Sequence, residues 1–269
     1  MNQDYIIPND WSIIEEGFNT ERIKSSESLF SIGNGAMGQR ANFEEDYSGS
    51  TFQGSYIAGV YYPDKTRVGW WKNGYPEYFA KVLNAPNWIG IHIKVNGESF
   101  DLHTCKNIES FRRELNMQEG WLARTFKATL PNDLQIQVNT KRFLSLELDE
   151  IGAIEYSIIP LNSNATITYE PYLDGGITNE DSNWDDKFWN ITNIASKNKQ
   201  AFIEAHTMKT NFHTCTFMES CFFIDQKMVD LPSEITQTER KISFAYTSNV
   251  QQNQTFTIHK FGGYTVDRN

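Results

Sequence analysis

The chain has 269 residues, and its 24 basic and 34 acidic side chains give a formal net charge of −10. A chain of this length forms one or two domains and buries a large core without disulfides. The acidic balance argues against nucleic acid or an anionic membrane as the main partner, because both would repel this surface. No apolar run approaches the ~20 residues of a membrane-spanning helix. A neutral ligand such as a sugar is compatible with the charge.

The two chain features that report on compartment are the N-terminus and the cysteines. The first residues carry neither a basic nor an apolar stretch, so we expect no signal peptide and a cytoplasmic location. A periplasmic location is the alternative if a leader has been removed. Cys215 and Cys221 fall on one expected strand, which would place them ~20 Å apart. A disulfide needs Cα atoms within ~7 Å, so we expect reduced, buried thiols.

The first clear element in the chain is a β-hairpin. Isoleucine and valine alternate with other residues over positions 89–95, and Asn96 and Gly97 follow before a second strand over 98–102. Strict alternation predicts a strand with one buried face, and an Asn-Gly pair between two such runs predicts a tight hairpin turn.

The same pattern continues to the end of the chain. Further strands are expected over residues 111–117, 121–130, 134–146, 151–159, 165–173, 201–208, 214–224, 241–248 and 254–264. Short turns join neighbouring strands, so the pattern predicts an antiparallel meander. No long amphipathic helix is evident. The expected fold is all-β, as one large antiparallel β-sandwich.

Two long segments, residues 61–87 and 174–190, interrupt this pattern, and both are rich in aromatic side chains. Loops of this length inside a compact domain are usually functional. Tryptophan offers a flat face to a sugar, and nearby aspartates can accept hydrogen bonds from its hydroxyls. An acidic loop whose tryptophans fold inward explains the composition equally well. The candidate substrate-binding residues in or beside these segments are Trp70, Trp71, Trp88, Trp184, Asp185 and Trp189.

Other chemistries find little support. Gly33, Gly35 and Gly38 match the spacing of a dinucleotide-binding loop, but no helix pattern follows them, so we expect them to let the backbone turn. The five histidines lack metal-ligand spacing; His213 and Cys215 could share a strand face, but two ligands do not make a zinc site. Neither a metal nor a catalytic nucleophile is expected.

A set of motifs resembles glycoside hydrolase family 65, which contains maltose, trehalose, kojibiose and nigerose phosphorylases and related α-glucosidases. The longest motif is ESLFSIGNGAMGQRANFEE at residues 27–45. The others follow in the order found in the family and read YIAGVY (56–61), LNAPNW (83–88), RRELNMQEG (112–120), KRFLSL (141–146) and DGGITN (174–179). Ala36 and Met37 depart mildly from the family, where larger side chains are common.

The resemblance implies a domain assignment. In this family an N-terminal sandwich, similar to the galactose-mutarotase supersandwich, precedes an (α/α)6 barrel that holds the catalytic Glu and the phosphate pocket. Residues 1–269 would then be a single N-terminal domain without catalytic residues or cofactor, and the barrel would be missing. Inorganic phosphate would be the co-substrate of the parent enzyme if that enzyme is a phosphorylase. The choice between phosphorylase and hydrolase depends on barrel residues and stays open.

Three hypotheses follow from these observations. In the first, the chain supports the barrel, the substrate cleft or a homodimer of an enzyme that acts on α-linked gluco-disaccharides. In the second, it is a self-sufficient carbohydrate-binding sandwich that uses its loop tryptophans. In the third, it is a structural or dimerisation module with an apolar docking patch.

Overall fold

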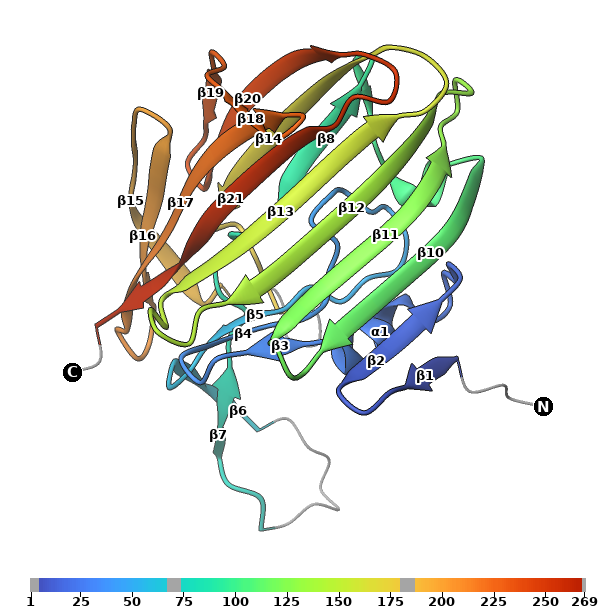
Figure 1. The fold of residues 1–269 in the computed structure, drawn as a ribbon. Coiled ribbons are helices and arrows are strands. Elements are labelled where there is room, and N and C mark those ends of the chain that lie inside the picture. The colour runs from blue at the N-terminus through green and yellow to red at the C-terminus, as the bar shows by residue number, and fades with distance from the viewer. Residues whose placement is uncertain (1–4, 67–73, 180–186, 268–269) are drawn as a thin grey trace.

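A computed structural model describes residues 5–66, 74–179 and 187–267. Its largest element is an eleven-stranded antiparallel sheet, the main sheet, in the order β1-β2-β10-β11-β12-β13-β21-β17-β16-β15, with β18 paired to β17. Figure 1 views its long central strands face on. The strands are β1 (Ile6–Pro8), β2 (Ser12–Glu16), β10 (Asn107–Asn116), β11 (Trp121–Thr129), β12 (Gln135–Leu144), β13 (Ile151–Pro160), β15 (Trp189–Lys197), β16 (Gln200–Thr207), β17 (His213–Ile224), β18 (Lys227–Val229) and β21 (Phe256–Val266).

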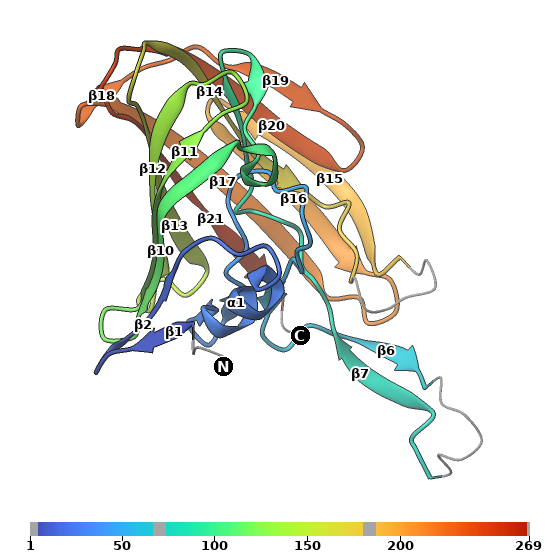
Figure 2. The same ribbon diagram turned by 90° about the vertical axis from the view of Figure 1, so that its right-hand side faces the viewer.

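A second sheet lies behind the main sheet and completes the sandwich (Figure 2). It has five strands in the order β19-β20-β14-β8-β9. These are β8 (Ile91–Val95), β9 (Glu98–Ser99), β14 (Ala165–Asp174), β19 (Glu234–Gln237) and β20 (Lys241–Val250). Apolar residues of both sheets form one continuous hydrophobic core. The predicted all-β sandwich is confirmed.

The meander is not continuous, which corrects the sequence-based expectation. Strands β10 to β13 do pair in chain order, but after β13 the chain crosses to the second sheet, where β14 pairs with β8 and β20. The free edge of β13 is paired by β21, from the end of the chain. The crossover is what closes two sheets around one core.

The remaining elements are short, and most of them lie at one end of the sandwich (Figure 1). A three-stranded sheet consists of β3 (Ile32–Gly33), β4 (Met37–Gln39) and β5 (Ser55–Ile57), and the helix beside it is α1 (Ile23–Leu29). The 3-10 turn η1 (Leu102–Thr104) lies at the opposite end, just before β10 (Figure 1). The strands β6 (Tyr61–Lys65) and β7 (Tyr78–Val82) form a hairpin, the arm, that extends away from the body (Figure 2). The predicted loop 61–87 is therefore in part a hairpin.

The core is built around Trp88, which is fully buried. A Cβ added at Gly152 of β13 would lie 2.5 Å from its indole ring, and one at Gly262 of β21 would lie 2.8 Å away. The two glycines therefore make room for the indole against the main sheet. On β8, Ile91, Ile93 and Val95 are all buried, as their alternation predicted.

All three cysteines are free. Burial raises the pKa of Cys215 and of Cys221, and it raises the pKa of the Cys105 thiol to about 12. These thiols are protonated at neutral pH and therefore weak nucleophiles. Among the described residues, no helix is long and apolar enough to cross a membrane.

Candidate functional site

The glycine-rich part of the motif at residues 27–45 forms the β3–β4 hairpin. Gly35 occupies its turn with φ of +91°, a conformation that favours glycine. The Asn34 side chain accepts hydrogen bonds from the backbone N–H groups of Ala36 and Met37 at 3.1 and 2.9 Å. Its amide donates to the carbonyl oxygens of Ser145 and Asp149 at 2.7 and 2.9 Å. The hairpin thus docks on the β12–β13 turn. Gly35 lets the backbone turn, as predicted, while Gly33 and Gly38 are paired with each other in β3 and β4.

The end of the same motif enters a buried ionic cluster. Glu44 accepts a hydrogen bond from Arg124 at 2.6 Å and pairs with Arg142 at 3.0 Å. Glu45 binds the same Arg124 guanidinium through both carboxylate oxygens, at 2.7 and 2.5 Å. All four side chains are buried. A buried charge is tolerated only when it is paired in this way, so the cluster fixes the motif against β11 and β12.

The cluster shifts the pKa values of its members. Burial alone would raise the pKa of Glu44, but the charges of Arg142 and Arg124 outweigh it and hold the pKa below its ordinary value. Burial lowers the pKa of Arg113 to about 10, against the opposing charge of Glu15, whose carboxylate lies 3.6 Å from the guanidinium. At neutral pH Glu44 is therefore a carboxylate and Arg113 a guanidinium cation.

The two long segments predicted to be functional are joined at their bases through Asn84. Its backbone N–H donates to the side chain of Asn179 at 2.8 Å, and its side-chain amide donates to the carbonyl of Thr178 at 3.2 Å. The Trp189 indole N–H donates to the carbonyl of Asn84 at 2.8 Å. Asn179 in turn donates to the carbonyl of Val82, at the end of the arm, at 2.9 Å. Two motifs that are far apart in the sequence meet at this junction.

Three hollows border this junction. One of about 340 Å³ includes Lys81 and Asn179 in its lining. A mainly apolar hollow of about 440 Å³ lies between the arm and the β3–β4 hairpin, and its lining includes Met37. The third, of about 630 Å³, is lined in part by Trp189 and Arg240. An aromatic edge beside a guanidinium and backbone amides can bind a hydroxyl-rich ligand.

The predicted substrate-binding residues divide into two groups. Trp70, Trp71, Trp184 and Asp185 lie outside the described residues. Trp88 is fully buried under the main sheet and packs on glycines, so its burial gives no support to a sugar contact. Trp189 is 8% exposed and reaches the third hollow with the edge of its ring.

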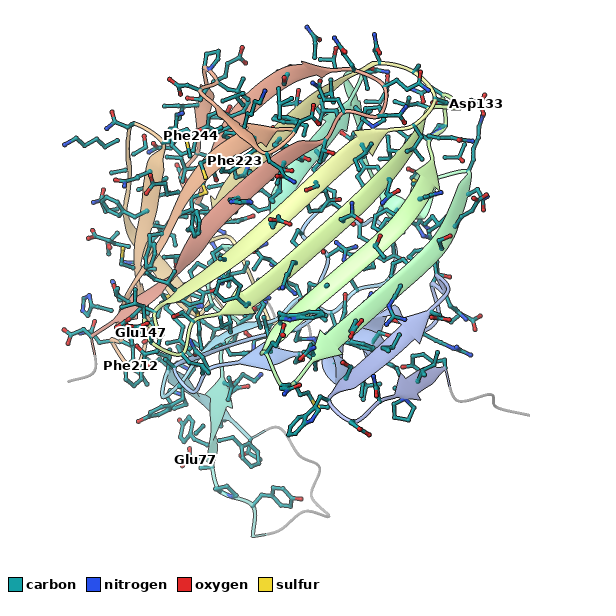
Figure 3. The ribbon with its side chains drawn as sticks, in the orientation of Figure 1. Glu77, Asp133, Glu147, Phe212, Phe223 and Phe244 are labelled. Atoms are coloured by element: carbon teal, nitrogen blue, oxygen red, sulfur yellow. The ribbon has the colours of Figure 1, made fainter. Side chains whose placement is uncertain are left out.

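Several large apolar side chains outside the core are exposed. On the arm and the β12–β13 turn these residues, which we call the arm end, are Tyr61, Tyr78, Phe79, Val82, Leu146 and Leu148. In Figure 3, Glu147 of that turn lies at the lower left of the sandwich, and Glu77 lies below it on the arm. No group of three or more potential metal ligands occurs in the part of the chain that the structure describes.

Comparison with known proteins identifies the family. The model of the glycosyl hydrolase family 65 N-terminal domain matches residues 13–269. The chain belongs to this family.

Family 65 relatives are much longer than this chain. Maltose phosphorylase of Bacillus subtilis (strain 168) is 47% identical over 217 residues, which cover 81% of this chain and 28% of that protein. Alpha,alpha-trehalose phosphorylase of Thermoanaerobacter brockii is 28% identical over 96% of this chain and 34% of its own length. The solved structure of a putative kojibiose phosphorylase from human microbiome superimposes with a TM-score of 0.84 at 25% identity, over 98% of this chain and 33% of that one. The chain thus spans about a third of these relatives.

Four of the six family 65 motifs quoted from the sequence meet in pairs: residues 27–45 and 141–146 in the ionic cluster, and residues 83–88 and 174–179 at the junction. Sequence reasoning did not assign the cluster. Arg124 carried a signal, because it occupies a core-facing position between the buried residues Leu122 and Phe126 on β11. A charge in such a register indicates a buried partner. Lys260, buried on β21 with hydrogen bonds to the carbonyls of Gly90 and Tyr172, carried the same signal.

Proposed function

We propose that this chain is the non-catalytic N-terminal domain of an α-glucoside phosphorylase or glycoside hydrolase that acts on α-linked gluco-disaccharides. One observation carries the proposal: the N-terminal domain model of family 65 matches residues 13–269, and the relatives that contain this segment are about three times longer. Their names, maltose phosphorylase and trehalose phosphorylase, motivate the substrate class.

In this proposal the catalytic acid belongs to the barrel of the longer parent protein. The substrate and, for a phosphorylase, inorganic phosphate bind there, and we propose no cofactor. The sandwich contributes a rigid support, because its core and its ionic cluster hold the family motifs in fixed positions.

The arm end is the surface that we propose meets the barrel or the second copy of a homodimer. Tyr61, Tyr78, Phe79 and Val82 are exposed on the two paired strands of the arm, and exposed apolar side chains that lie close together mark an interaction surface. Strand β21 also ends at this end of the sandwich (Figure 1). Trp70, Trp71, Trp184 and Asp185 lie outside the described residues, in the two segments whose described ends meet at Asn84. We propose that these residues contribute side chains to the substrate cleft, with Trp189 at its edge.

An assay of the isolated chain tests the absence of catalysis. Residues 1–269 are incubated with maltose, kojibiose or trehalose, with and without inorganic phosphate, and release of glucose and glucose 1-phosphate is measured. We expect no turnover with any of the three sugars. Sustained turnover that scales with the concentration of the purified chain would contradict the proposal.

A further inference from the structure

A separate hollow of about 460 Å³ lies on the outer face of the main sheet. It spans β11, β12, β13 and β21, four neighbouring strands in the centre of Figure 1. Its lining includes the side chains of Trp121, Phe143, Ala153 and Phe261. Its volume lies within the range of about 300–1,000 Å³ that small-molecule sites occupy.

These four residues form one row across the strands. Trp121 is the register partner of Phe143, Phe143 of Ala153, and Ala153 of Phe261. Phe143 and Phe261 are both exposed and stand on strands that flank β13, so their backbones are about 9.6 Å apart, twice the strand spacing. Ala153 leaves the space between them open. The slot is wide enough for one flat ring in contact with aromatic side chains on both sides, which needs about 7–8 Å.

A second row lies two residues away from the aromatic row on β12, β13 and β21, and its side chains are polar. Lys141 is the register partner of Glu155, and Glu155 of His259. The His259 imidazole lies 3.0 Å from the Glu155 carboxylate, and the Lys141 ammonium lies 4.7 Å from the centre of the Trp121 ring. All three side chains line the hollow. They offer donors and acceptors of both charge signs beside the aromatic slot.

We propose that this hollow binds a pyranose unit of a neutral gluco-oligosaccharide. The apolar C–H faces of the sugar ring would pack against Phe143 and Phe261, and its hydroxyls would hydrogen-bond with Lys141, Glu155 and His259. Trp121 extends the aromatic row towards the next sugar unit. This site goes beyond the proposed function, since it depends neither on the barrel nor on the family's catalysis.

The composition of the hollow favours a sugar over a protein partner. The centres of protein–protein interfaces are depleted of Lys and Glu. Here Lys141 and Glu155 line the hollow on the strands that also carry Phe143 and Ala153. Burying these charges against an apolar protein surface would carry a desolvation cost, whereas sugar hydroxyls can replace their water.

Isothermal titration of the 269-residue chain with maltotetraose and cellotetraose tests the proposal. We expect saturable binding of at least one of them with Kd near 1 mM, the weak end of the affinity scale. Phe143→Ala and Phe261→Ala each remove one wall of the slot, so each should weaken binding about tenfold. Ala153→Leu fills the slot and should abolish binding while the outer-face position preserves the fold. Trp11→Ala, which removes an exposed aromatic ring elsewhere, is the matched control and should bind as the wild type does.

Three results would overturn the proposal. The first is that neither sugar produces a heat of binding at concentrations up to about 20 mM, well above the expected Kd. The second is binding that Ala153→Leu and Phe143→Ala leave unchanged while circular dichroism confirms their fold. The third is self-association of the chain in sedimentation that Phe143→Ala abolishes, which would make this face a contact between copies.

Discussion

At the scale of single residues, the buried charges link the family motif to the sheet. Glu44 pairs with Arg124 on β11 and with Arg142 on β12. This one carboxylate therefore attaches the motif at residues 27–45 to two neighbouring strands of the main sheet. A network of this kind stabilises the fold only while every member is present, because a lone charge left in the core is costly.

Glu44→Gln tests this view. The variant keeps the shape of the side chain but leaves the two arginines with one negative charge fewer, so we expect a loss of about 3–5 kcal/mol in the free energy of unfolding at pH 7. Urea denaturation measures it. Glu147→Gln, at an exposed carboxylate on the β12–β13 turn, is the matched control and should change stability by less than about 0.5 kcal/mol. Equal stability of the two variants would contradict the role of the cluster.

The stability difference between wild type and Glu44→Gln should depend on pH. The pKa of Glu44 is lowered in the folded chain, so its contribution is complete above the unfolded value of about 4.3 and is lost as the pH falls through the folded pKa. Comparison of urea midpoints from pH 7 down to pH 3 should therefore show the two proteins converging in acid. A constant difference over this range would contradict the assignment of the shift.

Gly263 is the residue whose backbone conformation most restricts substitution. Its φ is +155°, and a Cβ there would lie 1.9 Å from the carbonyl oxygen of Glu150. Because a backbone atom cannot swing aside as a side chain can, we expect Gly263→Ala to lower the free energy of unfolding by at least about 2 kcal/mol. At Gly33 the nearest atom would be 3.5 Å away, so Gly33→Ala should cost less than about 1 kcal/mol. Thermal denaturation of both variants checks this; similar losses would contradict it.

Residue-level prediction from the sequence succeeded where local pattern decides, and it gave no account of packing that distant residues decide. The alternation around Ile91 correctly predicted its burial. Trp88 was predicted as a sugar contact because it adjoins an aromatic segment, but it packs on Gly152 and Gly262 from two other strands. Only the tertiary pairing of β13 with β21 places those glycines together.

At the scale of elements, Asn84 joins the arm to the segment after β14. Removing its side chain in Asn84→Ala breaks the bonds to Thr178 and to the backbone N–H of Ser55. We expect the free energy of unfolding to fall by about 1–3 kcal/mol. We also expect backbone amides in residues 78–82 and 174–179 to exchange hydrogen faster than in the wild type. Asn249→Ala, at an exposed asparagine on β20 whose side chain accepts a hydrogen bond from Thr166, should leave exchange in both segments unchanged. Unchanged exchange in Asn84→Ala would contradict the linkage.

The elements themselves were predicted best where strands are long and regular. Strands β10 to β13 and β14 lie where alternation and turn residues indicated. The edge strand β15 was not predicted, because Asn190, Thr192 and Asn193 interrupt its apolar pattern and a bulge follows Ile191. The hairpin of the arm was read as loop because β7 is mostly exposed and β6 buries only Tyr62, so neither strand has a buried face to set the period.

At the scale of the whole molecule, the order of motifs along the chain predicted the family, and the sandwich explains why they recur together. Residues 27–45 meet β11 and β12 in the ionic cluster, and residues 83–88 meet residues 174–179 at Asn84. Composition and periodicity alone predicted the all-β class but not the family. In the proposed function the catalytic acid belongs to a longer parent protein, so this sequence predicts the class of substrate only through its relatives.

A chimera gives the most direct test of the central claim, that this chain is a family 65 N-terminal domain that serves a catalytic barrel. Residues 13–269, the range that the family model matches, replace the corresponding segment of Bacillus subtilis maltose phosphorylase. Phosphate-dependent release of glucose 1-phosphate from maltose is then measured for the chimera. The account predicts that the rate of phosphorolysis by the chimera lies within about tenfold of the rate of the unmodified Bacillus subtilis enzyme, which corresponds to an activation free energy raised by at most about 1.4 kcal/mol. A chimera that folds with the parent's oligomeric state yet releases no glucose 1-phosphate would contradict it.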